Sequence, residues 1–209
     1  MAENSREAAP KPPLDSADAA WASLPAPFPP GELAELCRDI EAMFRLNPYY
    51  YFDVWRRTGT DAFHIEFENQ SNKTRQVLDL TATPGSGNVL TITYDQGIKK
   101  RTVFSIEPAL HGSRLTVTDD YERLPEAERE QRSAEVDKSL TAWAEALRLY
   151  FLRQKRWSWL PGWRWYIRRV WMPMKPSARR IVWFIYLITV AEFFFFLFVL
   201  LIWLIEKGD

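Results

Sequence analysis

The stretch Phe63-His64-Ile65-Glu66-Phe67-Glu68 alternates apolar and polar side chains with a period of two. This alternation is typical of a β-strand that has one face against a core and the other toward water. Similar runs follow after segments rich in Gly, Pro, Asn and Asp, at residues 76–83, 89–95, 101–107 and 114–121. With residues 50–57 as an earlier strand, the sequence predicts a six-stranded antiparallel meander. Residues 21–27 are expected to add a short edge strand.

The sequence predicts one helix before these strands and one after them. Before them, a helix is predicted over residues 31–46, closed by Asn47-Pro48, and Cys37 lies on its apolar face as core filling rather than as a nucleophile. After Pro125 a long helix is predicted, with one apolar stripe that needs the sheet as its partner. That stripe consists of Val136, Leu140, Trp143, Leu147, Tyr150 and Phe151.

The order of helix, antiparallel strands and long C-terminal helix resembles the START-like superfamily, also called helix-grip or SRPBCC, which includes polyketide cyclases and lipid-transfer domains. The resemblance covers about residues 20–155, and it includes Leu24-Pro25-Ala26-Pro27 ahead of the first helix. It implies an α+β helix-grip fold, in which a curved antiparallel sheet wraps around the long helix. The chain departs from the pattern in its short first strand and in the segment that follows the long helix. In architecture alone, a START-like domain followed by a membrane tail, it also resembles a family of carbon monoxide dehydrogenase subunits.

The resemblance further implies a cavity between sheet and helix for an apolar ligand such as a lipid, sterol, quinone or polyketide. Seven apolar side chains are candidates to line it: Trp55, Phe63, Phe104, Ile106, Trp143, Leu147 and Tyr150. The alternative is that the same side chains fill a solid core, and periodicity does not distinguish the two.

The C-terminal region predicts a membrane anchor. Residues 181–205 hold one charge, Glu192, and a helix of that length spans about 37 Å, more than the ~30 Å hydrocarbon core of a bilayer. A transmembrane helix is therefore expected over residues 177–206, with few residues beyond it. A buried core helix of a larger fold is the less favoured alternative.

Charge is distributed unevenly along the chain. Residues 1–145 carry 16 basic and 24 acidic side chains, a net charge of −8, whereas residues 146–191 carry ten basic side chains and no acidic one. By the positive-inside tendency, the N-terminal domain is expected in the cytoplasm and the C-terminus across the membrane. The basic segment is expected to meet anionic lipid headgroups, and the acidic head argues against a nucleic-acid partner.

The segment at residues 156–176 combines tryptophan with arginine, which is typical of a helix in the membrane interface. The alternative is that the tryptophans close the base of the soluble domain. The residues assigned to the interface are Trp157, Trp159, Trp163, Arg164, Trp165, Arg168, Arg169 and Trp171.

Signals for catalysis are few. His64 shares a predicted strand face with Glu66 and Glu68, and Asp53 is expected on the neighbouring strand, so an acid/base cluster is conceivable. A solvated polar sheet face explains the same residues, and this is the favoured interpretation. With one cysteine and no metal-ligand spacing, phosphate-binding loop or nucleophile elbow, we assign no catalytic residue, metal or cofactor.

Glu192 stands near the middle of the predicted span, where a charged carboxylate facing lipid is costly. It is neutral there, or it pairs with a polar group of a partner membrane protein, or it meets a quinone-like headgroup. These alternatives stay open.

The sequence thus predicts four parts: a disordered Pro/Ala-rich arm (1–20), a START-like domain (21–155), an interfacial segment (156–176) and a transmembrane helix (177–206). The expected function is binding or transfer of an apolar ligand by a membrane-tethered cytoplasmic domain. The alternatives are a non-catalytic accessory subunit of a membrane complex, assembled through Glu192, and a cyclase-like enzyme that uses the His64 region.

Overall fold

The computed structural model of the protein describes residues 19–121 and 138–208. Most of the arm predicted to be disordered therefore lies outside the described residues, as does Val136 of the predicted helical stripe. Ala19 and Ala20 do not belong to an arm, because they begin the first strand.

Seven strands form one antiparallel sheet, in the order β1-β7-β6-β5-β4-β3-β2. The predicted six-stranded meander is confirmed, because each strand from β2 to β7 pairs with the next one in the chain. The edge strand is also confirmed and is longer than expected, since β1 pairs with β7 along its whole length. The strands are β1 (Ala19–Ala26), β2 (Tyr50–Arg57), β3 (Ala62–Asn69), β4 (Thr74–Pro84), β5 (Val89–Tyr94), β6 (Arg101–Ala109) and β7 (Gly112–Asp120).

The turn between β6 and β7 requires glycine. Gly112 has a φ of +122°, which L side chains rarely adopt, and a Cβ at this position would collide with the carbonyl oxygen of Ala26. The close approach of the Ala26 backbone fixes the end of β1 against this turn.

The N-terminal helix is interrupted, whereas the sequence predicted one helix over residues 31–46. Two short helices replace it, α1 (Pro30–Cys37) and α2 (Ile40–Arg45), with Arg38 and Asp39 between them. The Asp39 side chain accepts a hydrogen bond from the backbone N–H of Ala42 at 3.3 Å and so caps α2. The apolar side chains keep helical spacing across Arg38 and Asp39, so the apolar pattern gives no sign of the break between α1 and α2.

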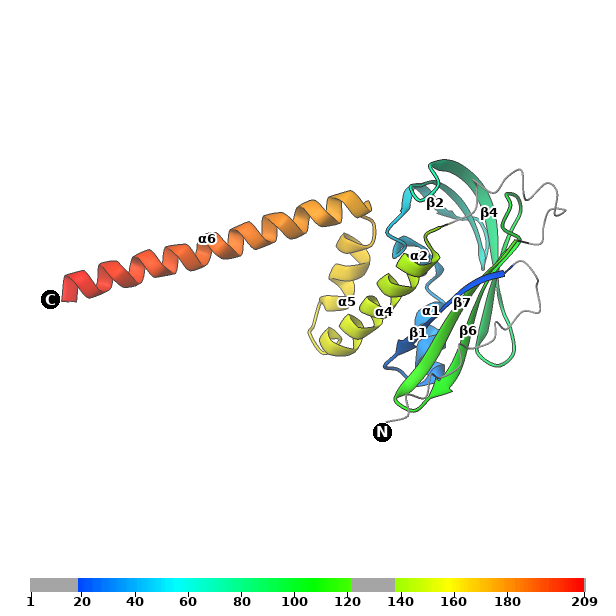
Figure 1. Ribbon diagram of the computed structural model, residues 1–209, viewed down its shortest axis with the longest axis horizontal. Coiled ribbons are helices and arrows are strands. Elements are labelled where there is room, and N and C mark those ends of the chain that lie inside the picture. The colour runs from blue at the N-terminus through cyan, green and yellow to red at the C-terminus, as the bar shows by residue number, and fades with distance from the viewer. Residues whose placement is uncertain (1–18, 122–137, 209) are drawn as a thin grey trace, which may run out of the picture.

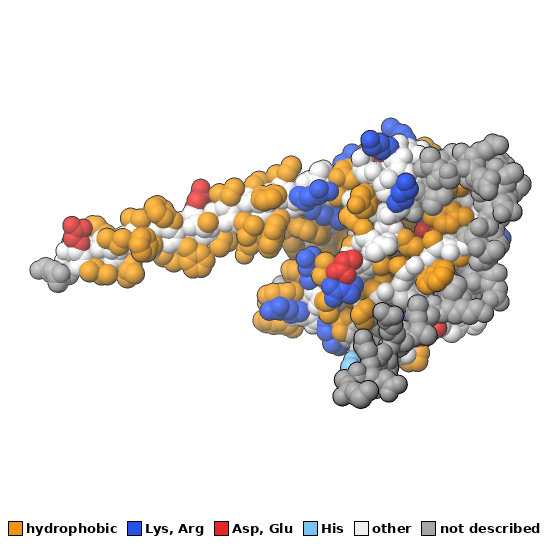
Figure 2. All heavy atoms as spheres, viewed as in Figure 1, with side chains coloured by type: hydrophobic (Ala, Val, Ile, Leu, Met, Phe, Trp, Pro, Cys, Tyr) orange, Lys and Arg blue, Asp and Glu red, His pale blue; other side chains and the backbone are white. Residues whose placement is uncertain are grey.

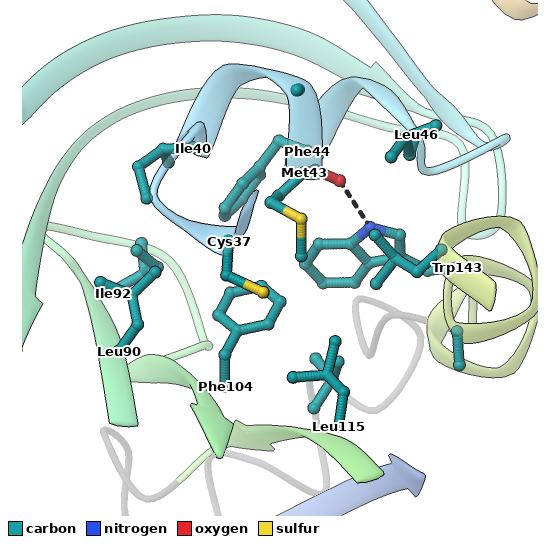
Figure 3. Packing of buried hydrophobic residues seen from close by; sticks show 14 of the residues in the cluster. Cys37, Ile40, Met43, Phe44, Leu46, Leu90, Ile92, Phe104, Leu115 and Trp143 are labelled. Atoms are coloured by element: carbon teal, nitrogen blue, oxygen red, sulfur yellow. Dashed lines mark hydrogen bonds between the residues drawn. The ribbon is translucent and has the colours of Figure 1, made fainter. Parts of the chain in front are cut away.

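The core lies between the concave face of the sheet, α1, α2 and the long helix α4 (Leu140–Trp157), which runs beside β1 (Figure 1). This is the predicted helix-grip arrangement. Trp143 of α4 is fully buried and projects toward α2, where its indole Nε1 donates a hydrogen bond to the Met43 carbonyl at 2.8 Å (Figure 3). Cys37 also lies in this core, and burial raises the pKa of its thiol to about 12.

A short neck connects α4 to the last helix. It contains α5 (Trp163–Tyr166) and a π-helical turn, η2 (Ile167–Trp171), and it folds back beside α4 (Figure 1). The last helix, α6 (Pro176–Gly208), then projects from the head as a single rod. It is long and apolar enough to span a membrane, and no part of its most apolar window is buried in the structure. Hydrophobic side chains cover the rod, and basic ones gather where it meets the head (Figure 2).

Candidate functional site: a groove between the head and the candidate membrane span

The space between sheet and helix, predicted as a cavity, is occupied by aromatic side chains in this structure. The Trp143 ring lies 5.4 Å from Phe44, 5.6 Å from Phe104 and 6.2 Å from Tyr50 between ring centroids. Phe104, Trp143 and Leu147 are fully buried, Ile106 is buried, and Trp55 and Phe63 pack against the cluster from its edge. All seven predicted lining residues therefore belong to the packed core or pack against its edge, and Tyr150 is one of those at the edge.

Tyr150 lines a separate, open groove at the base of the head, with a volume of about 240 Å³. That volume is slightly below the roughly 300–1,000 Å³ of pockets that enclose drug-sized ligands. Its walls come from the α2–β2 loop, α4, the neck and the first turn of α6. The apolar part of the wall consists of Leu46, Pro48, Ala146, Leu149, Tyr150, Trp163, Ile167, Trp171 and Pro176.

Three arginines complete the groove: Arg153 of α4, and Arg179 and Arg180 of α6. The Arg179 guanidinium is partly buried and donates to the backbone carbonyls of Trp171, Met172 and Arg45, at 2.8 to 3.1 Å. Arg153 and Arg180 are exposed, and within the described residues none of the three forms an ion pair with a carboxylate. The groove therefore carries uncompensated positive charge beside an apolar wall.

Two polar groups belong to residues of the apolar wall, the indole N–H of Trp163 and the hydroxyl of Tyr150. The indole Nε1 of Trp163 is buried and has no hydrogen-bond partner among the residues that the structure describes. The Tyr150 hydroxyl accepts from Gln154 Nε2 at 2.9 Å, and burial raises the pKa of the phenol, so it keeps its proton as a donor. A buried donor without a partner is costly to stability.

Two ion pairs hold the neck against the head. Arg168 donates to Asp39 Oδ2 at 2.7 Å, and Lys175 donates to Asp53 Oδ1 at 2.8 Å. Asp53 lies at a bulge in β2, where the pairing with β3 shifts register, and the bulge re-aims its side chain. The hydrogen bond from Lys175 holds the pKa of Asp53 below its usual value.

The predicted interface residues divide into two groups. Trp163 and Trp171 are half-buried and line the groove together with Ile167, so this apolar face of the neck packs on the head. Trp159 and Trp165 are 73% and 64% exposed. Trp157 is about one-third exposed and contacts the Trp163 ring at 6.0 Å. The basic members are all exposed: Arg164, Arg168 and Arg169.

The His64 cluster lies on the outer face of the sheet, away from the core. His64 Nδ1 lies 2.7 Å from Asp79 Oδ1, and its Nε2 lies 3.8 Å from Glu66. Arg75 lies within ion-pair distance of both Glu66 and Asp53. These residues form a charge-paired surface, and none of them lines the groove.

A buried polar network at the end of β7 was not anticipated. Asp119 is fully buried and receives hydrogen bonds from Lys99 Nζ at 2.7 Å and from Thr102 Oγ1 at 2.5 Å. The nearby hollow has a volume of about 20 Å³, room for roughly one water molecule, and is lined in part by Tyr50, Tyr94 and Lys99. The signal was present in the sequence, because Asp119-Asp120 interrupts the alternation at the end of a strand.

Comparison with known proteins identifies the fold. No protein-family model matches the chain, and no curated protein sequence does. Among solved structures, the Zhui aromatase/cyclase from Streptomyces sp. R1128 superposes with a TM-score of 0.52 at 11% identity, covering 68% of this chain and 98% of that one. The fold is the START-like, helix-grip fold.

Two further solved structures are similar to the START-like head. The di-domain ARO/CYC protein BexL, from the BE-7585A biosynthetic pathway, has a TM-score of 0.50 at 12% identity and covers 66% of this chain and 47% of its own. A START superfamily protein from Mycobacterium smegmatis has a TM-score of 0.46 at 16% identity and covers 65% and 97% of the two chains. At these identities the likeness concerns the fold of the head, and it leaves the neck and α6 to be explained from this chain.

Proposed function

We propose that this protein is a membrane-tethered, non-catalytic binding protein for an apolar ligand, with its START-like head held at the cytoplasmic surface by α6. The observation that carries the proposal is the position of the groove. Its walls combine α4 and the neck with the first turn of α6, so it lies where the head would meet the bilayer.

The tether supports binding through effective concentration. A groove held at the membrane surface samples lipid-soluble molecules at a much higher local concentration than a freely diffusing domain does. The basic neck would add attraction to anionic headgroups, at about 1 kcal/mol for each basic side chain near the surface.

A direct test of ligand binding uses the intact protein, purified in a mild non-ionic detergent. Native mass spectrometry, followed by solvent extraction and lipid analysis, should find one apolar molecule per chain that survives extensive detergent exchange. A chain that is always recovered at its bare mass, with no extractable apolar compound, would rule out the proposal.

The tether has its own test, alkaline extraction of membranes that contain the protein. The intact chain should remain in the pellet. The double variant Ile188→Arg/Phe195→Arg should move to the supernatant, because each arginine at mid-span costs several kcal/mol, whereas Ile188→Leu/Phe195→Leu should not. Release of the unaltered chain would count against a membrane span.

Assembly with a membrane protein is a second candidate function, favoured by Glu192. This residue and the following Phe193 to Phe196 are exposed on α6, with 58–67% of each phenylalanine uncovered. Glu192→Leu should release a co-purifying membrane protein, while Glu192→Gln, which keeps the hydrogen-bonding capacity, should retain it. An unchanged set of partners in Glu192→Leu would remove this candidate.

A further inference from the structure

The groove also indicates which class of apolar ligand it takes. Resting on the proposed function, we infer that it binds one acyl chain of an anionic phospholipid drawn from the surrounding bilayer, with the phosphate on Arg153 and Arg180. The site thus differs from the space between sheet and helix, which Trp143 and its aromatic neighbours fill.

Charge complementarity is the first argument. Arg153 and Arg180 lie at the groove without an ion-pair partner in the described part of the chain, whereas Arg179 uses its N–H groups on backbone carbonyls. Residues 146–191 contain no acidic side chain that could neutralise them. Guanidinium groups bind phosphate through charge-assisted hydrogen bonds, so an anionic headgroup suits this rim and a zwitterionic one gains less.

Continuity with the candidate span is the second argument. Pro176, Arg179 and Arg180 belong to the start of α6, and the apolar stretch, whose one charged residue is Glu192, begins at Ile181. The arginines are therefore placed at headgroup level if residues 181–205 occupy the hydrocarbon core. A lipid can then leave its phosphate at the rim while one chain turns into the groove.

The apolar wall is the third argument. Leu149, Tyr150, Trp163, Ile167 and Trp171 line the groove beside the arginines. A wall of this kind receives a hydrocarbon chain, and the guanidinium groups receive a phosphate. The groove therefore combines an apolar wall with a cationic rim, which together match a phospholipid.

The test titrates the intact protein, in non-ionic detergent micelles, with phosphatidylglycerol or phosphatidylcholine and counts bound lipid by native mass spectrometry. We expect one phosphatidylglycerol per chain, bound about tenfold or more tightly than phosphatidylcholine. Arg153→Gln/Arg180→Gln should weaken phosphatidylglycerol binding by about tenfold or more and remove this preference. Arg169→Gln, which removes an exposed neck charge outside the groove, should not change it. Glycerol phosphate should not bind measurably, and binding as tight as that of the lipid would overturn the acyl-chain assignment.

Two further variants separate the groove from other lipid contacts. Ala146→Phe should block binding by filling the groove, whereas Leu152→Phe, on the same helix but outside the groove, should not. If an apolar ligand is retained but is neutral and insensitive to these variants, the inference is wrong while the proposed function stands. If no apolar ligand is retained at all, both are wrong.

Discussion

The indole Nε1 of Trp143 donates a hydrogen bond to the backbone carbonyl of Met43 at 2.8 Å, and this contact joins the long helix to the short helix α2 through the middle of the START-like head. The Trp143 ring occupies the space in which the resemblance implied a ligand cavity. The interior thus serves stability in this structure, and the open groove lies outside it, beside α6.

Replacing Trp143 should therefore be costly. Trp143→Ala is expected to lower the free energy of unfolding by about 3–5 kcal/mol, because it leaves a cavity and an unpaired Met43 carbonyl. Leu152→Ala, at a site on the same helix that is 42% exposed, should cost much less. Denaturant unfolding of the intact protein in detergent measures both. Equal effects of the two substitutions would show that Trp143 does not hold the core.

Cys37 should be unreactive in the folded protein. Burial raises the pKa of its thiol to about 12, so almost no thiolate forms at about pH 8, where alkylating reagents act. Iodoacetamide should label the chain slowly under native conditions and rapidly in denaturant, as followed by the mass of the protein. The assay is unambiguous because the sequence has one cysteine. Fast native labelling would contradict the packing around α1.

Docking of the neck should weaken in acid. The pKa of Asp53 is lowered in the folded protein by Lys175, so the stabilising contribution of this pair is present above the unfolded pKa of about 3.9 and is lost as pH falls through the lower folded value. Because both side chains are substantially exposed, the contribution is at most about 1 kcal/mol.

Hydrogen exchange in the neck, quenched after labelling at a series of pH values, should show faster opening only below about pH 4, after correction for the intrinsic rate. Asp53→Asn should show this opening at every pH. A neck whose protection depends on neither pH nor Asp53 would show that the ion pair does not contribute to docking.

Arg179 should couple α6 to the head. Its three hydrogen bonds reach the end of α2 and the end of the neck, so Arg179→Gln is expected to destabilise the junction by about 1–3 kcal/mol. Exchange protection should fall in the neck and at the C-terminus of α2, and Arg169→Gln serves as a charge-matched control. Unchanged protection in Arg179→Gln would mean that packing alone holds the junction.

The sheet could be predicted because its signal is local. Alternation such as that of residues 63–68 is decided by neighbours in the chain, and so is the helical stripe through Trp143 and Leu147. The break between α1 and α2 was missed although Asp39 carries a capping signal, because apolar spacing across Arg38 and Asp39 still fitted one helix.

The groove could not be predicted in the same way. Its walls come from residues 46–48, 146–154, 163–171 and 176–180. These segments are far apart in the sequence, so a local sequence pattern does not predict that they meet. Trp163, Ile167 and Trp171 form an apolar face of the neck that packs on the head, and periodicity cannot tell whether such a face meets lipid or protein. Whether the helix-grip interior is open or filled depends on the fit of side-chain volumes, which a sequence pattern does not encode.

The central claim, that the tethered head takes an apolar molecule into the groove beside α6, is tested most directly by photolabelling. The intact protein is reconstituted in vesicles that contain a phosphatidylglycerol with a photoreactive acyl chain, and the labelled peptides are mapped. The account predicts labelling of α4 around Ala146 to Tyr150 and of Trp163, in addition to α6, and loss of the α4 label in Ala146→Phe. Labelling confined to residues 181–205 would contradict it.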